Sequence, residues 1–189
     1  MRKEAKTMRN LLKRISALLL CLLLVLSLPV TALAEEAQDS EEGTTLRIAR
    51  RQQFLDFAEN CRLDSYSRNL SVILLTDIDL TGVDFSGIPI FCGNFDGNGL
   101  TVSGLSITRD GSNMGLFRYV DASGVIQNLT VSGAVTPDGS RSAVGGIAGH
   151  NAGKIQNCFF DGTVSGSDDV GGIAGINAIP GIIDGCHSK

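Results

Sequence analysis

Two stretches near the C-terminal end repeat one another closely: residues 144–158 have the sequence VGGIAGHNAGKIQNC, and residues 170–186 have the sequence VGGIAGINAIPGIIDGC. The initial valines are 26 positions apart and the final cysteines 28, because the second copy carries the extra pair Ile179-Pro180. Insertions confined to a turn, with the apolar positions preserved, are typical of solenoid repeats. Further copies are therefore expected upstream.

A looser copy lies at residues 115–129, where GVIQNL at 124–129 matches GKIQNC at 153–158. Glycines cut each repeat into two or three short strands, and such a repeat has the length of one coil of a parallel β-helix. The sequence thus predicts an all-β, parallel β-helix over residues 70–189, with copies at about 115–135, 146–166 and 172–189. An antiparallel barrel is the alternative, but such regular repeats are not typical of it.

Stacked coils place equivalent side chains one strand spacing apart, about 4.8 Å, so each column of side chains must be chemically compatible with itself. Three apolar columns pass this test. They are Leu116 with Ile147 and Ile173, Ile126 with Ile155 and Ile183, and Leu129 with Cys158 and Cys186.

A polar column is predicted beside them. Asn128 would lie against Asn157 in an amide ladder, as stacked asparagines do in other parallel strands, and Gly185 would end that ladder. The glycines of the two VGGIAG copies suit corners that need positive φ or a close approach of two backbones.

The chain changes character before the strands begin. Phe54, Phe57, Ala58 and Cys61 recur at helical spacing within residues 47–61, although no clear N-capping side chain precedes them. We expect an N-terminal capping helix region at residues 46–69. Residues 35–45, EEAQDSEEGTT, are acidic and almost free of apolar side chains, which predicts a flexible linker.

The N-terminal segment, residues 1–34, has the pattern of a secretory signal peptide. Basic residues precede an apolar run from Ile15 to Leu28, and Ala32-Leu33-Ala34 then offers small residues at the cleavage positions. An uncleaved membrane anchor is the alternative, but the run is shorter than the roughly 18 residues that span a bilayer. Cleavage after Ala34 would give a secreted or cell-surface protein without a stable membrane span.

Net charge argues against nucleic acid as a partner. Residues 1–34 carry a net charge of +5, and the remainder carries −9 with only scattered arginines. Binding to a phosphate backbone depends on clustered Lys and Arg.

Several acidic residues are candidates for catalysis or metal binding. Asp77 with Asp79 alternates with apolar residues as the wet face of a strand would, and Asp168-Asp169 is predicted to lie in a solvated turn between coils. Glycoside hydrolysis requires two carboxylates across a scissile bond, which neither pair establishes. The segment FDGNG at residues 95–99 lacks the spaced acids of a calcium loop and predicts a tight turn.

Histidine and cysteine offer no clear site either. His150 has isoleucine as its counterpart in the next copy, so we interpret it as an exposed turn residue. The mature chain would keep four cysteines, without a CxxC pair; we expect Cys158 and Cys186 to remain buried thiols. The predicted catalytic, cofactor-binding and metal-binding residues are therefore none, and we expect no enzymatic activity.

With its repeats aligned, the chain resembles the GLUG-motif family of bacterial surface proteins. The resemblance rests on residues 115–129, on the two GGIAG copies and on FDGNGLTVSGLSI at residues 95–107, with an entry segment like FLDFAEN followed by LLTDIDLTG before them. It implies a right-handed β-helix, of the pectate-lyase-like kind, in an exported or wall-associated protein. Arg118 departs from the pattern, because the other copies have Gly149 and Gly175 there.

These observations predict a structural or adhesive module of a bacterial cell surface that binds a glycan or protein of the host or of bacteria. The alternative is the non-catalytic N-terminal region of a larger secreted enzyme, such as an immunoglobulin-A-specific metallopeptidase-like or polysaccharide-degrading protein. The last copy stops shortly after Cys186, at Lys189. We therefore expect further coils or domains beyond Lys189, because solenoids cover their open ends.

Overall fold

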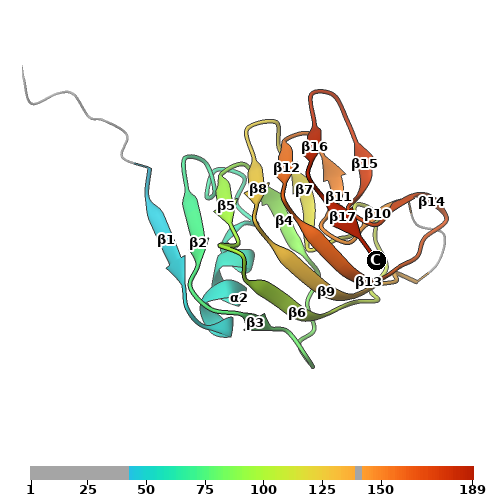
Figure 1. Cartoon of the computed structure of the whole chain (residues 1–189), viewed down its shortest axis with the longest axis horizontal. Helices are drawn as coiled ribbons and strands as arrows, with labels where there is room; N and C mark the ends of the chain where they lie inside the picture. Colours follow the sequence, from blue (N-terminus) through green and yellow to red (C-terminus); the bar gives the residue numbers. More distant parts are fainter. Residues whose placement is uncertain (1–42, 139–141) are drawn as a thin grey trace, which may run out of the picture. The chain divides into compact units, whose positions relative to one another are not determined.

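The computed structural model describes residues 43–138 and 142–189. The predicted signal peptide, and the predicted linker as far as residue 42, lie outside the described residues. The described part forms a parallel β-solenoid of about five turns with one helix (Figure 1). Every strand pair in it is parallel, which excludes the antiparallel barrel.

Three sheets form the walls of the solenoid, and each coil contributes one strand to each wall in most of the stack. The first sheet contains, in spatial order, β1 (Thr45–Ile48), β2 (Ser71–Leu74), β5 (Asn94–Asp96), β8 (Val125–Gln127), β12 (Lys154–Gln156) and β16 (Ile182–Asp184). The second contains β3 (Ile78–Asp79), β6 (Thr101–Ile107), β9 (Thr130–Val135), β13 (Phe159–Val164) and β17 (His187–Ser188). The third contains β4 (Ile88–Phe91), β7 (Phe117–Val120), β11 (Ala148–Asn151) and β15 (Ala174–Asn177). A separate pair joins β10 (Ser142–Gly145) to β14 (Asp168–Gly171).

The predicted apolar columns are confirmed by the strand register. Ile126 pairs with Ile155 and Ile155 with Ile183; the pairing of Phe117 with Ala148 likewise sets Leu116 beside Ile147. The middle members are fully buried, whereas Ile183 in the last described coil is 37% exposed. Burial of such columns from coil to coil is the main source of stability in this fold.

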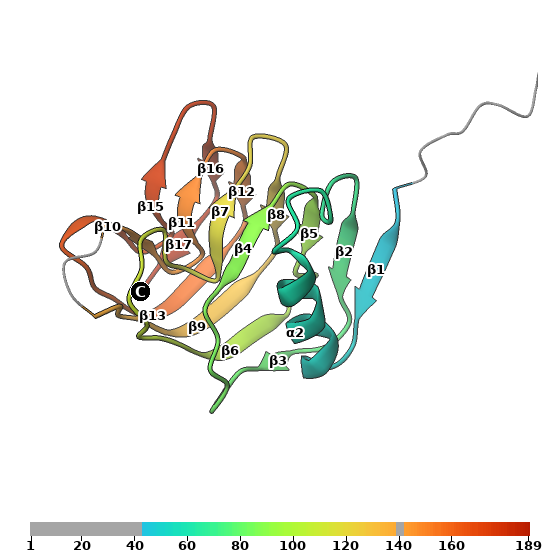
Figure 2. The same ribbon diagram turned by 180° about the vertical axis from the view of Figure 1, so that it is seen from behind.

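Helix α2 (Arg51–Asn60) lies at the N-terminal end of the solenoid, beside β1 and β3 (Figure 2). Phe54 and Phe57 are buried against the first coils, so the helix caps the core as predicted. Its N-terminus lacks a capping side chain on Arg50, but Gln53 accepts a hydrogen bond from the Ala49 N–H at 2.9 Å. In a capping box the side chain at this position accepts from the N-cap residue, here Arg50, whereas Gln53 accepts from the residue before it.

Strand β1 was not predicted. Its four residues, TLRI, fall where the sequence indicated the end of the linker and the start of the helix region. They pair with β2 from Thr45 to Ile48 and begin the first sheet. A strand this short has too little alternation to be recognised without its partner.

Two amide ladders run along the first sheet and its following turn. Gln156 donates to Gln127 at 2.7 Å, and Gln127 donates to Asp96 at 3.1 Å. The predicted contact of Asn157 with Asn128 is present at 3.5 Å, and Asn128 in turn donates to Asp96 at 3.1 Å. Both ladders therefore meet on the Asp96 carboxylate.

Backbone conformation gives a second reason for the asparagine column. Asn128 and Asn157 have φ of 53° and 51°, and Gly185 has φ of 61°. Asparagine and glycine tolerate this left-handed conformation better than other residues. Gly185 in the last coil therefore ends the asparagine ladder, because it has no side-chain amide, but it keeps the left-handed conformation of the turn.

Candidate functional site

The outer surface near the third sheet carries two adjoining hollows, and we call them together the arginine groove. The first, of about 440 Å³, is lined by Arg62, Ser86, Pro89, Arg109, Asp110, Met114 and Arg118. The second, also about 440 Å³, is lined by Pro89, Ile90, Asn113, Arg118 and Tyr119. Arg118 and Pro89 line both hollows, so they form the junction of the groove.

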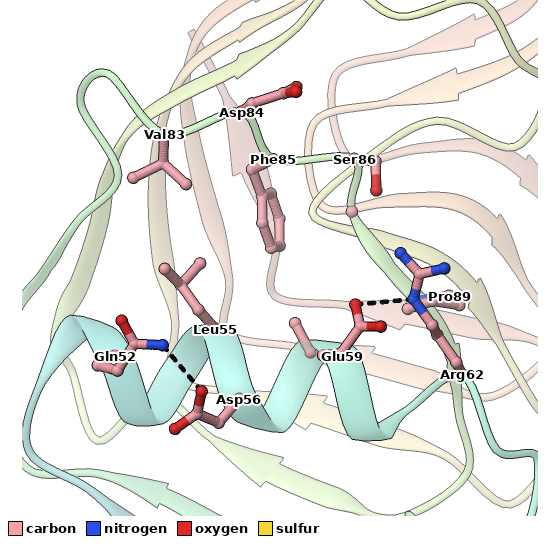
Figure 3. Close-up of a pocket in the computed structure, with 12 residues that line it drawn as sticks. Gln52, Leu55, Asp56, Glu59, Arg62, Val83, Asp84, Phe85, Ser86 and Pro89 are labelled. Carbon is pink, nitrogen blue, oxygen red and sulfur yellow. Dashed lines mark hydrogen bonds and ion pairs between the residues drawn. The ribbon is translucent and has the colours of Figure 1, made fainter.

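A third hollow, the helix cleft, lies between α2 and residues 83–89 and has a volume of about 360 Å³ (Figure 3). Phe85 and Leu55 point towards one another across it. Its polar rim is occupied by contacts within the helix region: Gln52 donates to Asp56 at 2.8 Å, and Arg62 donates to Glu59 at 2.8 Å. The cleft therefore offers few uncommitted polar groups.

Arg118 lies on β7 in register with Pro89, Gly149 and Gly175 on the neighbouring strands. A Cβ atom at Gly149 would lie 2.2 Å from the carbonyl carbon of Asn113, because the preceding segment crosses the sheet there. At Arg118 the neighbouring segment contains Gly87, which has no side chain. A Cβ atom added to Gly87 would lie 2.8 Å from the Arg118 Cγ, so the glycine leaves the space that the arginine side chain occupies. The pattern of the repeats is broken at Arg118 without disturbing the sheet.

The three arginines of the groove differ in how their charge is compensated. Arg62 forms an ion pair with Glu59 at 2.8 Å, and Arg109 forms a bidentate pair with Asp84. The Arg109 guanidinium lowers the pKa of Asp84 and is itself held charged. Arg118 instead donates to two backbone carbonyls, those of Asn113 at 3.4 Å and Ser112 at 3.2 Å. Within residues 43–138 and 142–189, no carboxylate lies within ion-pair distance of it.

Beside Arg118, a column of large side chains crosses the third sheet from Ile90 to Tyr119, His150 and Ile176. The Tyr119 and His150 rings stack with centroids 4.8 Å apart and planes at 16°. His150 is therefore not an exposed turn residue, as its sequence position suggested, but a half-buried residue of β11. Its Nδ1 atom is buried without a hydrogen-bond partner in the described structure.

The aspartates considered for catalysis are engaged in backbone contacts or exposed. Asp77 accepts a hydrogen bond from the Thr101 N–H and Asp79 one from the Thr81 N–H, both at 2.8 Å. Hydrogen bonds from Thr81 lower the pKa of Asp79, which keeps that carboxyl ionised. Ile78 between them is buried, so the predicted wet strand face is confirmed.

Asp168 and Asp169 are not in a turn, contrary to the sequence interpretation. They begin β14, which pairs with β10, and both side chains are exposed. The repeats align Val144 with Val170 on these two strands, but the start of β14 was not recognised because aspartate is depleted in strands.

The FDGNG segment forms the predicted tight turn. Asn98 and Gly99 both have positive φ, as a tight turn requires. Asp96 accepts a hydrogen bond from the Asn98 N–H at 2.8 Å, besides those from the Gln127 and Asn128 side chains of the two ladders. Both oxygens of the Asp96 carboxylate therefore accept hydrogen bonds from within the chain. Elsewhere in the described part of the chain, no three His, Cys, Asp or Glu side chains are grouped as metal ligands.

The cysteines are free thiols in the structure. Cys61 and Cys158 are buried, and burial raises the pKa of each to about 12. Cys186 shares the interior column with Cys158, but it is only half-buried because it lies in the last described coil. The expectation of two buried thiols therefore holds for Cys158 alone.

Alkylation with iodoacetamide at pH 8 tests this difference. We expect Cys186 to react roughly tenfold faster than Cys158 in the folded protein, since the reactive species is the accessible thiolate. Peptide mass spectrometry at timed intervals would measure both rates, with urea-unfolded protein as the control in which they become similar. Equal rates in the folded protein would contradict the burial of Cys158.

The architecture and the repeats define a class: a parallel β-solenoid built from glycine-rich coils. Within that class, a model of the GLUG motif matches residues 140–165, which confirms the resemblance to GLUG-motif proteins. No solved structure matches the chain.

Two curated relatives are similar to part of the chain. Halomucin from Haloquadratum walsbyi is 42% identical over 98 residues, which cover 51% of this chain and 1% of halomucin. A putative Gly-rich membrane protein from Evansella cellulosilytica is 35% identical over 96 residues, which cover 44% of this chain and 11% of that protein. The matched segments are thus small parts of both relatives. Among the helices that the structure describes, none is long and apolar enough to cross a membrane.

Proposed function

We propose that this chain is a structural and adhesive β-solenoid module of an exported bacterial cell-surface protein. The observation that carries the proposal is the combination of a GLUG-bearing solenoid with similarity to halomucin and to a Gly-rich membrane protein. In a solenoid each coil contacts only its neighbours, so added coils lengthen a rigid surface without a new core. That property suits a module that projects and presents a binding face.

Asp79 and Asp84 do not have the property that the general acid of a glycosidase requires. A glycosidase needs one carboxyl with a raised pKa to act as the general acid. The pKa values of Asp79 and Asp84 are instead lowered by hydrogen bonds from Thr81 and Arg109. These groups stay ionised and serve the turn and the ion pair that they hold.

The alternative is the non-catalytic N-terminal region of a larger secreted enzyme, metallopeptidase-like or polysaccharide-degrading. It is favoured by the finding that the matched segments make up only 1% and 11% of their relatives. Modules of this kind therefore occur within much longer polypeptides.

Surface display tests the proposal directly. The full chain with a C-terminal epitope tag would be expressed in a Gram-positive host, and intact cells would be stained with antibody before and after external protease treatment. We expect the tag on intact cells, where external protease removes it, or in the culture medium where no anchor retains the chain; a tagged cytoplasmic protein is the negative control. Staining that appears only after cell lysis would refute surface location, and polysaccharide hydrolysis by the purified chain would refute the non-catalytic role.

Export is expected to remove residues 1–34. N-terminal sequencing of the exported chain should begin at Glu35, because Ala32 and Ala34 supply the small residues that signal peptidase requires. The variant Ala34→Arg should accumulate uncleaved, while Ala37→Arg, beyond the cleavage site, should be processed normally. An exported chain that retains Arg2 and Lys3 would contradict the prediction.

A further inference from the structure

We propose that the arginine groove binds the carboxylate of an acidic glycan, with Arg118 as the residue that recognises it. This inference rests on the proposed adhesive function and names the class of ligand for that surface. It begins from the uncompensated charge of Arg118 and from the position of that residue at the junction of two hollows.

The charge argument compares three arginines that line one groove. Arg62 and Arg109 have carboxylate partners, whereas Arg118 has only two neutral carbonyls among the described residues, at 3.2 and 3.4 Å. A guanidinium carries five N–H donors, and two contacts leave donors available. A ligand carboxylate would supply the missing negative charge and match the planar donor geometry of arginine.

Arg118 is also held in position before any ligand arrives. It belongs to β7, which lies between β4 and β11 in the third sheet, and its Cγ fits against Gly87. The carbonyls of Ser112 and Asn113 fix its guanidinium end. A side chain that is already ordered loses less conformational entropy on binding.

The remaining lining suits the hydroxyl groups of a sugar chain. Tyr119 lines the second hollow, and its phenol can both donate and accept hydrogen bonds. Ser86 lines the first hollow together with Arg118. Two hollows of about 440 Å³, which share Pro89 and Arg118 in their lining, are concave sites of a size that binds small ligands and would accept successive sugar units.

The charge balance favours a sparsely charged chain over a polyanion. Asp110 also lines the first hollow and has an interaction partner of its own, and Arg109 is neutralised by Asp84. One uncompensated positive charge therefore remains among the described groove residues. Isolated carboxylates on an otherwise neutral, hydroxylated chain fit this arrangement, whereas a dense polyanion would meet Asp110 and Asp84.

A protein partner is disfavoured by the small number of exposed apolar anchors among the described groove residues. Protein interfaces bury about 800 Å² on each partner and depend on large apolar or aromatic side chains. The large apolar side chains that are exposed in the described structure lie outside the groove: Leu63, Leu75, Val170, Ile179, Ile182 and Ile183.

Isothermal titration of the purified mature chain, residues 35–189, would test the inference. The probes are hyaluronan hexasaccharide, which carries a carboxylate on alternate sugars, its methyl ester, and a glutamate hexapeptide. We expect hyaluronan hexasaccharide to bind about tenfold or more tightly than its neutral ester, since the ester keeps the size but loses the charge.

Variants assign the binding to Arg118. We expect Arg118→Gln to weaken binding about tenfold and Arg118→Lys to weaken it less, because lysine keeps the charge but not the planar fork. Arg68→Gln, at an exposed arginine outside the groove, is the matched control and should bind as the unchanged chain does. Circular dichroism melting would verify that each variant folds. If Arg118→Gln unfolds, the single variants Arg118→Lys and Tyr119→Phe still test whether the groove binds the saccharide.

Three results would overturn the inference: no preference for hyaluronan hexasaccharide over its ester, binding unaffected by every folded groove variant, or tighter binding of the glutamate peptide. The last would indicate a protein ligand. These outcomes are independent of surface display, so a surface-displayed chain without glycan binding refutes this inference alone. A glycan-binding chain confined to the cytoplasm refutes the proposed function and leaves the groove assignment standing.

Discussion

Replacing Phe95 by alanine is expected to lower the free energy of unfolding by about 3–5 kcal/mol. Phe95 is fully buried, and its ring centroid lies 6.5 Å from that of Phe54, 5.9 Å from Phe57, 6.2 Å from Phe91 and 5.3 Å from Phe117. It therefore joins the capping helix to the first coils. Alanine would leave a cavity at this junction and loosen the cap.

Urea denaturation followed by circular dichroism would measure the loss. The matched control is Phe159→Ala, because Phe159 lies half-exposed on the second sheet and contacts the His187 ring at 5.7 Å. We expect the control to cost about 1 kcal/mol or less, since little buried area is lost. Similar losses in the two variants would show that Phe95 does not hold the cap to the coils.

Replacing Gly146 by alanine is expected to cost about 3 kcal/mol, through overpacking rather than through loss of contacts. An added Cβ would lie 2.3 Å from the Phe160 ring and 2.5 Å from the Gly172 carbonyl oxygen. Phe160 is buried, and Gly172 belongs to the adjacent coil, so neither has room to move away. The coils on either side would have to separate.

Gly82→Ala is the matched control for this effect. Gly82 has φ of +74°, and no atom lies within 4 Å of the position its Cβ would take. Alanine there meets only the backbone cost of the left-handed conformation, about 1–2 kcal/mol. Thermal unfolding of both variants would separate the two causes, and a Gly146→Ala chain as stable as the control would refute the crowding at this corner.

The interior of the solenoid was predictable because near-identical repeats can be aligned with one another, and the alignment shows which side chains stack. Ile126, Ile155 and Ile183 were placed in one column from spacing alone, and the strand register agrees. For the VGGIAG glycines, the sequence left positive φ and close approach open. The structure selects close approach at Gly146, whose φ is not among the positive values.

The outer surface was not predictable in the same way. The arginine groove brings together Arg62, Pro89 and Arg118, which lie far apart in the sequence, and the later repeats have glycine at the positions in register with Pro89 and Arg118. Arg118 was recognised as a departure from the pattern, but its meaning depends on the course of the Ser112–Asn113 segment. His150 was misjudged because its stacking partner, Tyr119, occupies the equivalent place in another coil and has no sequence likeness to it.

The two amide ladders have a consequence for how a chain of this kind grows by duplication of its coils. Gln156 and Asn157 donate towards Gln127 and Asn128, and these donate towards Asp96. An ionised carboxylate accepts hydrogen bonds and donates none, so it fixes one direction for both ladders. A coil duplicated after Asp96 can extend the ladders, whereas a copy inserted before it would present further amides to a carboxylate that is already engaged. New repeats are therefore accommodated most readily on the C-terminal side of Asp96.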